Sequence, residues 1–143
     1  MNSALRTVVV LLCLWPSLVL AQSSDITADD RRAIRAVIED QLAAFRRDDG
    51  PAAFAHATAR IQARFQTPEI FMRMVRGGYQ PVYRPRLVEF RDIFEWHGLP
   101  TQRVYLVGPD GVPVIALYPM ERQPDGTWKI DGCTLVRAGD DMV

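Results

Sequence analysis

The hydrophobic pattern of the chain changes its period near Gln80, and this change constrains the fold more than any other feature of the sequence. Before this point apolar residues recur at helical spacing, and after it they form short runs typical of β-strands. Helices that precede the strands, instead of alternating with them, are typical of the α+β class. The length of 143 residues favours one domain. We therefore expect N-terminal helices packed on an antiparallel sheet, within a single domain of residues 22–143.

Start and stop signals divide the first half of this domain into three helices. Thr27 is suited to cap the first helix, whose apolar stripe runs from Ile34 to Phe45. The expected helices cover residues 27–47, residues 51–65, and a short stretch that starts at Thr67-Pro68-Glu69 and ends at Gly77-Gly78. Residues 79–85 contain two prolines, which disfavour helix for the residue before each, so we expect an extended segment there.

The second half contains four strand-like runs at residues 87–96, 103–107, 112–120 and 127–137. Short turns separate them, and two of these turns are Pro-Asp-Gly, in which proline fixes φ and glycine takes a positive φ. Connections this short join adjacent antiparallel strands. The run 112–120 is apolar on both alternating sets, so both faces of the sheet need cover. Three short helices suffice for one face, and we expect a second copy of the chain on the other, as a homodimer. The alternative is that the first helix and the terminal segments wrap around the sheet.

Residues 1–21 read as an export signal: Arg6 precedes an apolar run from residue 7 to residue 20, and small residues lead to a cleavage site after Ala21. The protein is then expected in the periplasm or secreted, without a membrane segment after cleavage; a retained N-terminal anchor is the alternative. Cleavage leaves Cys133 as the one thiol, which predicts no internal disulfide. We interpret Cys133 as a buried small apolar residue, with a reactive thiol as the alternative.

Short sequence blocks in the first half of the domain carry a family resemblance. They are Ile38-Glu39-Asp40-Gln41-Leu42 with Phe45, Asp48-Asp49, Phe54-Ala55, Phe71-Met72, Met74-Val75, and Gly78-Tyr79 with Pro81-Val82. In these blocks the chain resembles an exported bacterial family known as domain of unknown function 4864, within the nuclear transport factor 2-like superfamily. The likeness covers residues 28–137. It implies a cone-shaped fold with a cavity between helices and a curved sheet, and it implies no activity, because the superfamily contains enzymes and non-catalytic modules alike.

Motifs for phosphate, dinucleotide, nucleophile or zinc sites are absent from the sequence, and we expect no metal and no cofactor. His56 and His97 stand far apart, and we interpret them as a solvated helix position and a loop residue. Basic and acidic residues balance at 17 each, which argues against nucleic-acid binding.

Asp92 is the candidate catalytic residue. In strict alternation it shares a strand face with the apolar residues Val88, Phe90, Phe94 and Trp96. A carboxylate in such surroundings is desolvated, and its pKa rises towards a range useful for acid–base chemistry. The alternative is a β-bulge near Asp92 that leaves the carboxylate facing water or paired with an arginine.

A second candidate group consists of side chains suited to line an apolar pocket with a few polar groups. These predicted ligand-binding residues are Tyr79, Tyr83, Arg84, Trp96, Tyr105 and Tyr118. Ordinary core packing is the alternative for the aromatic ones. Three functions remain open: binding of a small apolar or amphipathic ligand, an isomerase- or dehydratase-like reaction that uses a pocket carboxylate, and a non-catalytic dimeric accessory module.

Overall fold

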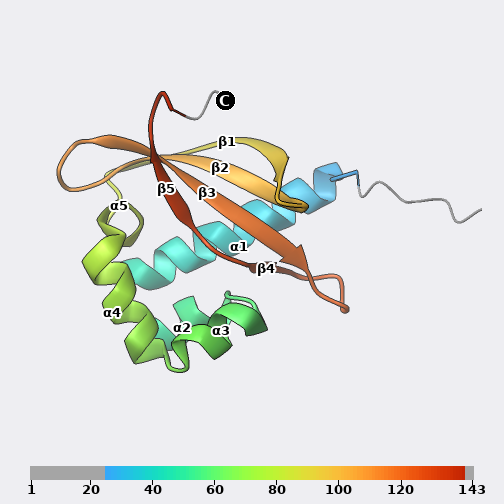
Figure 1. The fold of residues 1–143 in the computed structure, drawn as a ribbon, viewed down its shortest axis with the longest axis horizontal. Coiled ribbons are helices and arrows are strands. Elements are labelled where there is room, and N and C mark those ends of the chain that lie inside the picture. Colours follow the sequence, from blue (N-terminus) through green and yellow to red (C-terminus); the bar gives the residue numbers. More distant parts are fainter. Residues whose placement is uncertain (1–24, 141–143) are drawn as a thin grey trace, which may run out of the picture.

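The structure is a computed structural model that describes residues 25–140 (Figure 1). The expected export signal and its cleavage site lie outside these residues. Between residues 25 and 140, no helix combines the length and the apolar character that a membrane span needs.

The first helix, α1 (Ala28–Arg46), confirms the expected 27–47. A capping box starts it: the Thr27 hydroxyl accepts from the Asp30 backbone N–H, and the Asp30 carboxylate accepts from the Thr27 backbone N–H. That carboxylate also accepts from the indole N–H of Trp128 at 3.3 Å and from Arg122. These contacts therefore join the N-terminus of α1 to the end of the sheet where the chain turns from Arg122 to Trp128.

The expected helix at residues 51–65 is wrong as one element, because it breaks into α2 (Gly50–Ala55) and α3 (Ala59–Phe65). At the break, the Ile130 N–H donates to the His56 carbonyl and the Thr58 N–H donates to the Ile130 carbonyl, each at 2.9 Å. Thr58 then caps α3. A strand more than 70 residues away along the sequence thus takes the backbone groups that would continue the helix.

The third expected helix is confirmed as α4 (Pro68–Gly78), capped by Thr67. The extended segment expected next is wrong: a short helix, α5 (Gln80–Tyr83), occupies it. Pro81 stands in the first turn of α5, where its missing N–H costs no hydrogen bond. This turn packs closely on the sheet, since a Cβ added to Gly108 would lie 2.9 Å from the Pro81 Cα.

Five strands form one antiparallel sheet in the order β1-β2-β3-β4, with β5 also paired to β3. Their bounds are β1 (Leu87–Trp96), β2 (Leu99–Val107), β3 (Pro113–Arg122), β4 (Trp128–Ile130) and β5 (Thr134–Arg137). The turn between β1 and β2 places His97 at φ 50° and Gly98 at φ 78°, as a type I′ hairpin requires. Both Pro-Asp-Gly turns are present, with Gly111 and Gly126 at positive φ as predicted.

The expected strand 127–137 is interrupted at residues 131–133. Thr134 pairs with Leu117 and Ile130 pairs with Met120, so three residues of this edge oppose the two residues between those partners. The extra residue is a β-bulge, which bends the strand and re-aims its side chains. We call residues 131–133 the edge bulge.

The helices pack on one face of the sheet, and in Figure 1 α1 runs along the strands while α2, α3 and α4 gather below them. The helices share a core with one alternating set of strand residues, which are Val104, Leu106, Ala116, Tyr118 and Met120. The structure therefore confirms an α+β fold with the helices first and an antiparallel sheet after them.

The opposite face of the sheet is covered in part by the chain itself. Ile115 and Leu117 point to this outer face, yet they are only 3% and 8% exposed. Long side chains shield the face: the Arg91 guanidinium lies 5.2 Å from the centre of the Tyr105 ring, and that of Arg103 lies 3.8 Å from the centre of the Phe94 ring. The outer face thus needs less cover than its pattern suggests, and the homodimer stays a prediction.

Candidate functional site

A cavity of about 520 Å³ opens between the helices and the edge bulge. We call it the interlayer pocket. Its walls come from α1, α3, α4 and α5 on one side, and from Tyr118, Pro119 and residues 130–134 on the other. A volume of this size is typical of small-molecule sites, which cover about 300–1,000 Å³.

The interior of the interlayer pocket is apolar. Its lining includes Phe45, Ile61, Phe65, Phe71, Val75 and Val82. Phe71 lies at the centre of an aromatic cluster, with its ring centre 5.3 Å from that of Phe54, 5.6 Å from that of Phe65 and 6.1 Å from that of Phe45. Since α1, α2, α3 and α4 contribute one ring each, the cluster holds these four helices together on one side of the pocket.

Tyr118 places a hydroxyl group in this apolar lining. The residue is 1% exposed, and its hydroxyl atom is itself buried, with the Cys133 thiol as its side-chain interaction partner in residues 25–140. Burial, followed by the interaction with Cys133, holds the pKa of this hydroxyl well above its usual range, so it stays protonated. The hydroxyl therefore belongs to the packed wall of the pocket rather than to its open volume.

Cys133 lies beside Tyr118 on the edge bulge. The residue is partly exposed, but its thiol is buried, and this burial raises the pKa of the thiol to about 12. A thiol with such a pKa is protonated at neutral pH and is a poor nucleophile. This agrees with our interpretation of Cys133 as an apolar packing residue.

Asp131 joins the edge bulge to α3. The Arg60 guanidinium donates to both carboxylate oxygens of Asp131, at 3.1 and 2.7 Å, and to its backbone carbonyl at 2.7 Å. The Thr58 hydroxyl donates to the same carboxylate at 2.7 Å. We call Thr58, Arg60 and Asp131 the bulge clamp. The charges of Arg60 and Asp131, which both line the pocket, are therefore paired with each other.

Tyr79, between α4 and α5, makes a second contact with the edge bulge: its hydroxyl donates to the Cys133 carbonyl at 3.1 Å. Burial raises the pKa of this phenol, the Cys133 thiol raises it further, and nearby Arg64 lowers it. Arg64 itself is exposed and lines the pocket, so its guanidinium stands at the mouth. In residues 25–140, no carboxylate forms an ion pair with Arg64.

The structure brings Tyr79 and Tyr118 together in the pocket, but it does not place the other four predicted ligand-binding residues there. Trp96 stacks on His97 at the β1–β2 hairpin, with 4.6 Å between ring centres. Tyr105 lies on the outer face beneath Arg91. The expectation that these aromatics share one cavity is wrong, because alternation along β2 sends Tyr105 to the face opposite Val104 and Leu106.

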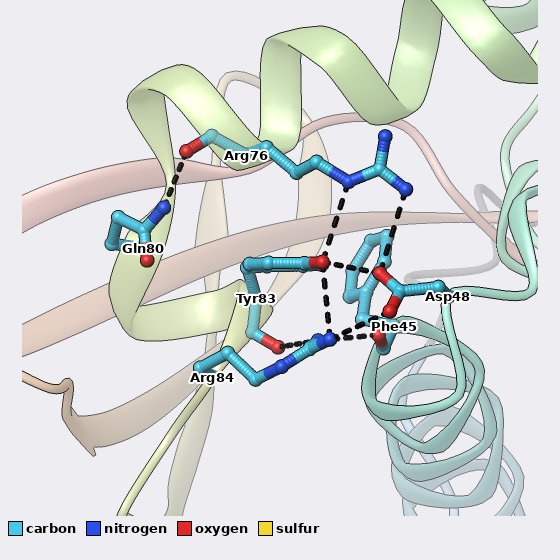
Figure 2. A network of polar contacts seen from close by, with 6 residues as sticks. All are labelled: Phe45, Asp48, Arg76, Gln80, Tyr83 and Arg84. Atoms are coloured by element: carbon cyan, nitrogen blue, oxygen red, sulfur yellow. Dashed lines mark hydrogen bonds and ion pairs between the residues drawn. The ribbon is translucent and has the colours of Figure 1, made fainter.

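Tyr83 and Arg84 belong to a surface network around Asp48, shown in Figure 2. The Arg84 guanidinium donates to the Asp48 carboxylate at 2.9 Å and to the Phe45 carbonyl at 2.6 Å, and it lies 3.8 Å from the centre of the Tyr83 ring. The Tyr83 hydroxyl and Arg76 also donate to Asp48. These contacts tie α4 and α5 to the C-terminal end of α1, so their role is to hold the helical layer together.

This network predicts a pH-dependent stability. The hydrogen bond from Tyr83, followed by the charge of Arg84, lowers the pKa of Asp48. A lowered pKa in the folded state means that the ionised carboxylate stabilises the fold above about pH 4, and that this contribution is lost as the pH falls through the lowered value. We expect Asp48→Asn to lower the melting temperature at pH 7, and the difference from the wild type to shrink as the pH falls through the lowered pKa of Asp48.

Asn suits the test because it tolerates the left-handed backbone of residue 48, whose φ is 53°. Melting curves at low ionic strength measure the difference at each pH. A difference that stays constant from pH 7 to pH 2.5 would contradict the assigned role of the carboxylate charge.

Asp92 does not lie in the interlayer pocket. The register of β1 and β2 shifts between Phe90 and Ile93, so a bulge breaks the strict alternation that would have turned Asp92 inwards. Asp92 is exposed, and it accepts a hydrogen bond from Arg103 at 2.6 Å. The alternative that we left open, a bulge with a salt link, is what the structure has. A catalytic role for Asp92 stays a prediction, without support from its position.

Carboxylate and imidazole groups are scarce in the lining of the interlayer pocket. The one carboxylate in its lining belongs to Asp131, which is engaged by Arg60 and Thr58, and neither described histidine lines it. Within residues 25–140 no group of His, Cys, Asp or Glu is placed to hold a metal ion. Sequence reasoning missed Arg60, Arg64 and Asp131, and their signal was weak: two arginines one helical turn apart, and an aspartate beside glycine.

The fold and the site together define an α+β domain with an apolar pocket between its helical layer and the bulged edge of its sheet. The model of the family described as "Domain of unknown function (DUF4864)" matches residues 27–143, and the chain belongs to this family. Neither a search of curated proteins nor a search of solved structures gave a significant match.

Proposed function

We propose that this domain binds a small apolar or amphipathic molecule in the interlayer pocket, without carrying out a reaction on it. The volume of the interlayer pocket, together with its aromatic and aliphatic lining, carries this proposal. Concave, mostly apolar sites with a few polar groups are typical of small-molecule binding. The apolar part of a ligand fills this volume, and the exposed Arg64 guanidinium offers a polar group at the mouth.

Several observations favour a binding protein over the alternative of an isomerase-like enzyme. An acid–base reaction needs a titratable group within reach of the bound molecule. Asp131 is held in the bulge clamp, Asp92 lies on the outer side of the sheet, and the Cys133 thiol is protonated. The polar groups that face the pocket are thus suited to orient a ligand.

The proposal includes the nuclear transport factor 2-like cone as the architecture of the domain. Its support is the order of helices before strands, the helical cover on one sheet face, and the two bulges at β1 and at residues 131–133, because bulges curve a sheet. The apolar run at residues 7–20 supports export. We therefore propose that the ligand is met in the periplasm or outside the cell.

Filling the pocket tests the proposal. We expect Met74→Trp and Phe65→Trp to weaken binding of the neutral fluorescent probe N-phenyl-naphthylamine at least tenfold, because both residues line the cavity and an indole occupies part of it. Phe65 is partly exposed and already aromatic, so its replacement preserves the fold even if the partly buried Met74 position does not tolerate the larger ring. Fluorescence titration gives the affinities, and circular dichroism checks folding.

Val112→Trp is the matched control, since Val112 is 53% exposed and lies away from the pocket. It should bind the probe like the wild type. If the wild type binds no better than Phe65→Trp, or if Val112→Trp weakens binding equally, the pocket is not the binding site. Mass spectrometry of molecules that copurify with the wild type, and not with Phe65→Trp, would identify the natural ligand.

A further inference from the structure

We infer that the ligand is an amphipathic carboxylate, whose charged head binds the Arg64 guanidinium at the mouth while its apolar body fills the interlayer pocket. This inference rests on the proposed function and adds the chemical class of the ligand. It follows from the charges at the mouth of the pocket and from the apolar lining.

The charges that line the pocket do not cancel. They are the two guanidinium groups of Arg60 and Arg64 and the one carboxylate of Asp131. Arg60 forms an ion pair with Asp131, in which its Nε and one terminal nitrogen donate to the two carboxylate oxygens. One positive charge is left over, and it belongs to Arg64.

Arg64 is held at the entrance without an acidic partner. Its guanidinium lies 5.8 Å from the centre of the Phe65 ring, which directs it along the apolar rim. Its charge lowers the pKa of Tyr79, so the guanidinium also acts on the opposite side of the entrance. An arriving anion therefore displaces water from Arg64, with no ion pair to break. A guanidinium offers two parallel N–H groups that match the two oxygens of a carboxylate.

The interior fits an apolar body rather than a polar one. Phe45, Ile61, Phe71 and Val82 offer no hydrogen bonds to a sugar or a nucleotide base. One unpaired guanidinium also suits a single negative charge better than a polyphosphate.

Three probes with the same tail and different heads test the inference: dodecanoate, dodecanol and dodecyltrimethylammonium, each at a concentration at which it stays monomeric in solution. Isothermal titration calorimetry on the purified protein at two salt concentrations gives their dissociation constants. We expect dodecanoate to bind at least fivefold more tightly than dodecanol, and the ammonium compound to bind most weakly. Added salt should weaken dodecanoate and leave dodecanol unchanged.

Variants assign the head group to one residue. Arg64→Gln should remove the preference for dodecanoate over dodecanol, and Arg64→Lys should retain part of it. Arg73→Gln, which changes an exposed arginine of α4 outside the interlayer pocket, is the matched control and should leave the preference intact.

The outcomes separate this inference from the proposed function. If dodecanol binds as well as dodecanoate, or if Arg64→Gln keeps the preference, the pocket binds ligands but the carboxylate assignment is wrong. If none of the three probes binds, and the wild type also fails to bind N-phenyl-naphthylamine, both the pocket function and the carboxylate assignment are wrong. Tighter binding of the ammonium compound would also overturn the assignment.

Discussion

Replacing Phe71 by alanine is expected to lower the free energy of unfolding by about 3–5 kcal/mol, the usual cost of removing a buried phenylalanine. Phe71 is 6% exposed, and its ring contacts one ring each from α1, α2 and α3. The truncation therefore leaves a void at the point where the whole helical layer meets. Total stabilities of about 5–15 kcal/mol make this a large fraction. Chemical denaturation followed by circular dichroism measures the change.

Two controls separate packing from a local effect on α4. Phe71→Leu keeps most of the volume and should cost less than half as much. Ile70→Ala removes an apolar side chain from the same helix at a position that is 40% exposed, and it should change stability by less than about 1 kcal/mol. Equal losses for Phe71→Ala and Ile70→Ala would show that the ring cluster does not organise the helices.

Asp131→Ala is expected to lower the free energy of unfolding by about 2–3 kcal/mol and to weaken ligand binding at the same time. The carboxylate is the acceptor for Thr58, which is 2% exposed, and for Arg60. Without it the Thr58 hydroxyl is buried with no side-chain partner, and hydrogen bonds to charged groups contribute about 1.5–3 kcal/mol each. The edge bulge then loses its side-chain attachment to Thr58 and Arg60 and keeps the bond from Arg60 to the backbone carbonyl of residue 131, which loosens this wall of the pocket.

A double-mutant cycle tests whether Thr58 and Asp131 act as one unit. Thr58→Val in the Asp131→Ala background should cost clearly less than in the wild type, since the acceptor is already gone. Arg60→Ala should cost less than Asp131→Ala, because the Arg60 side chain is 64% exposed. Fully additive losses, or a loss below 0.5 kcal/mol for Asp131→Ala, would contradict the bulge clamp.

Local signals predicted the elements that local interactions decide. Thr27 and Thr67 cap α1 and α4 where expected, and the two Pro-Asp-Gly turns separate strands as predicted. The break at residues 56–58 could not be predicted in this way, because its cause is Ile130, a partner distant in sequence. The alanine-rich stretch around it has high helix propensity, and tertiary pairing overrides that propensity.

The candidate site residues were likewise predictable only where the local strand pattern continues without interruption. Tyr118 was placed correctly because its strand alternates without interruption up to the pocket. Asp92 was placed wrongly because one extra residue in β1 reverses the faces beyond Phe90, and the sequence around it carries no glycine to mark the bulge. Arg60 and Arg64 were missed because exposed arginines on a helix are common, and only the fold shows which of them has a carboxylate partner.

The two bulges affect whether the sheets of two copies of the chain can pair edge to edge. A sheet presents unpaired backbone groups along its outermost strands, and regular outermost strands recruit further strands into fibres. Here β1 is interrupted after Phe90, and the opposite rim is interrupted at residues 131–133. Neither rim offers a long, even template, so the edge bulge, which shapes the interlayer pocket, and the bulge in β1 both disfavour the addition of further strands.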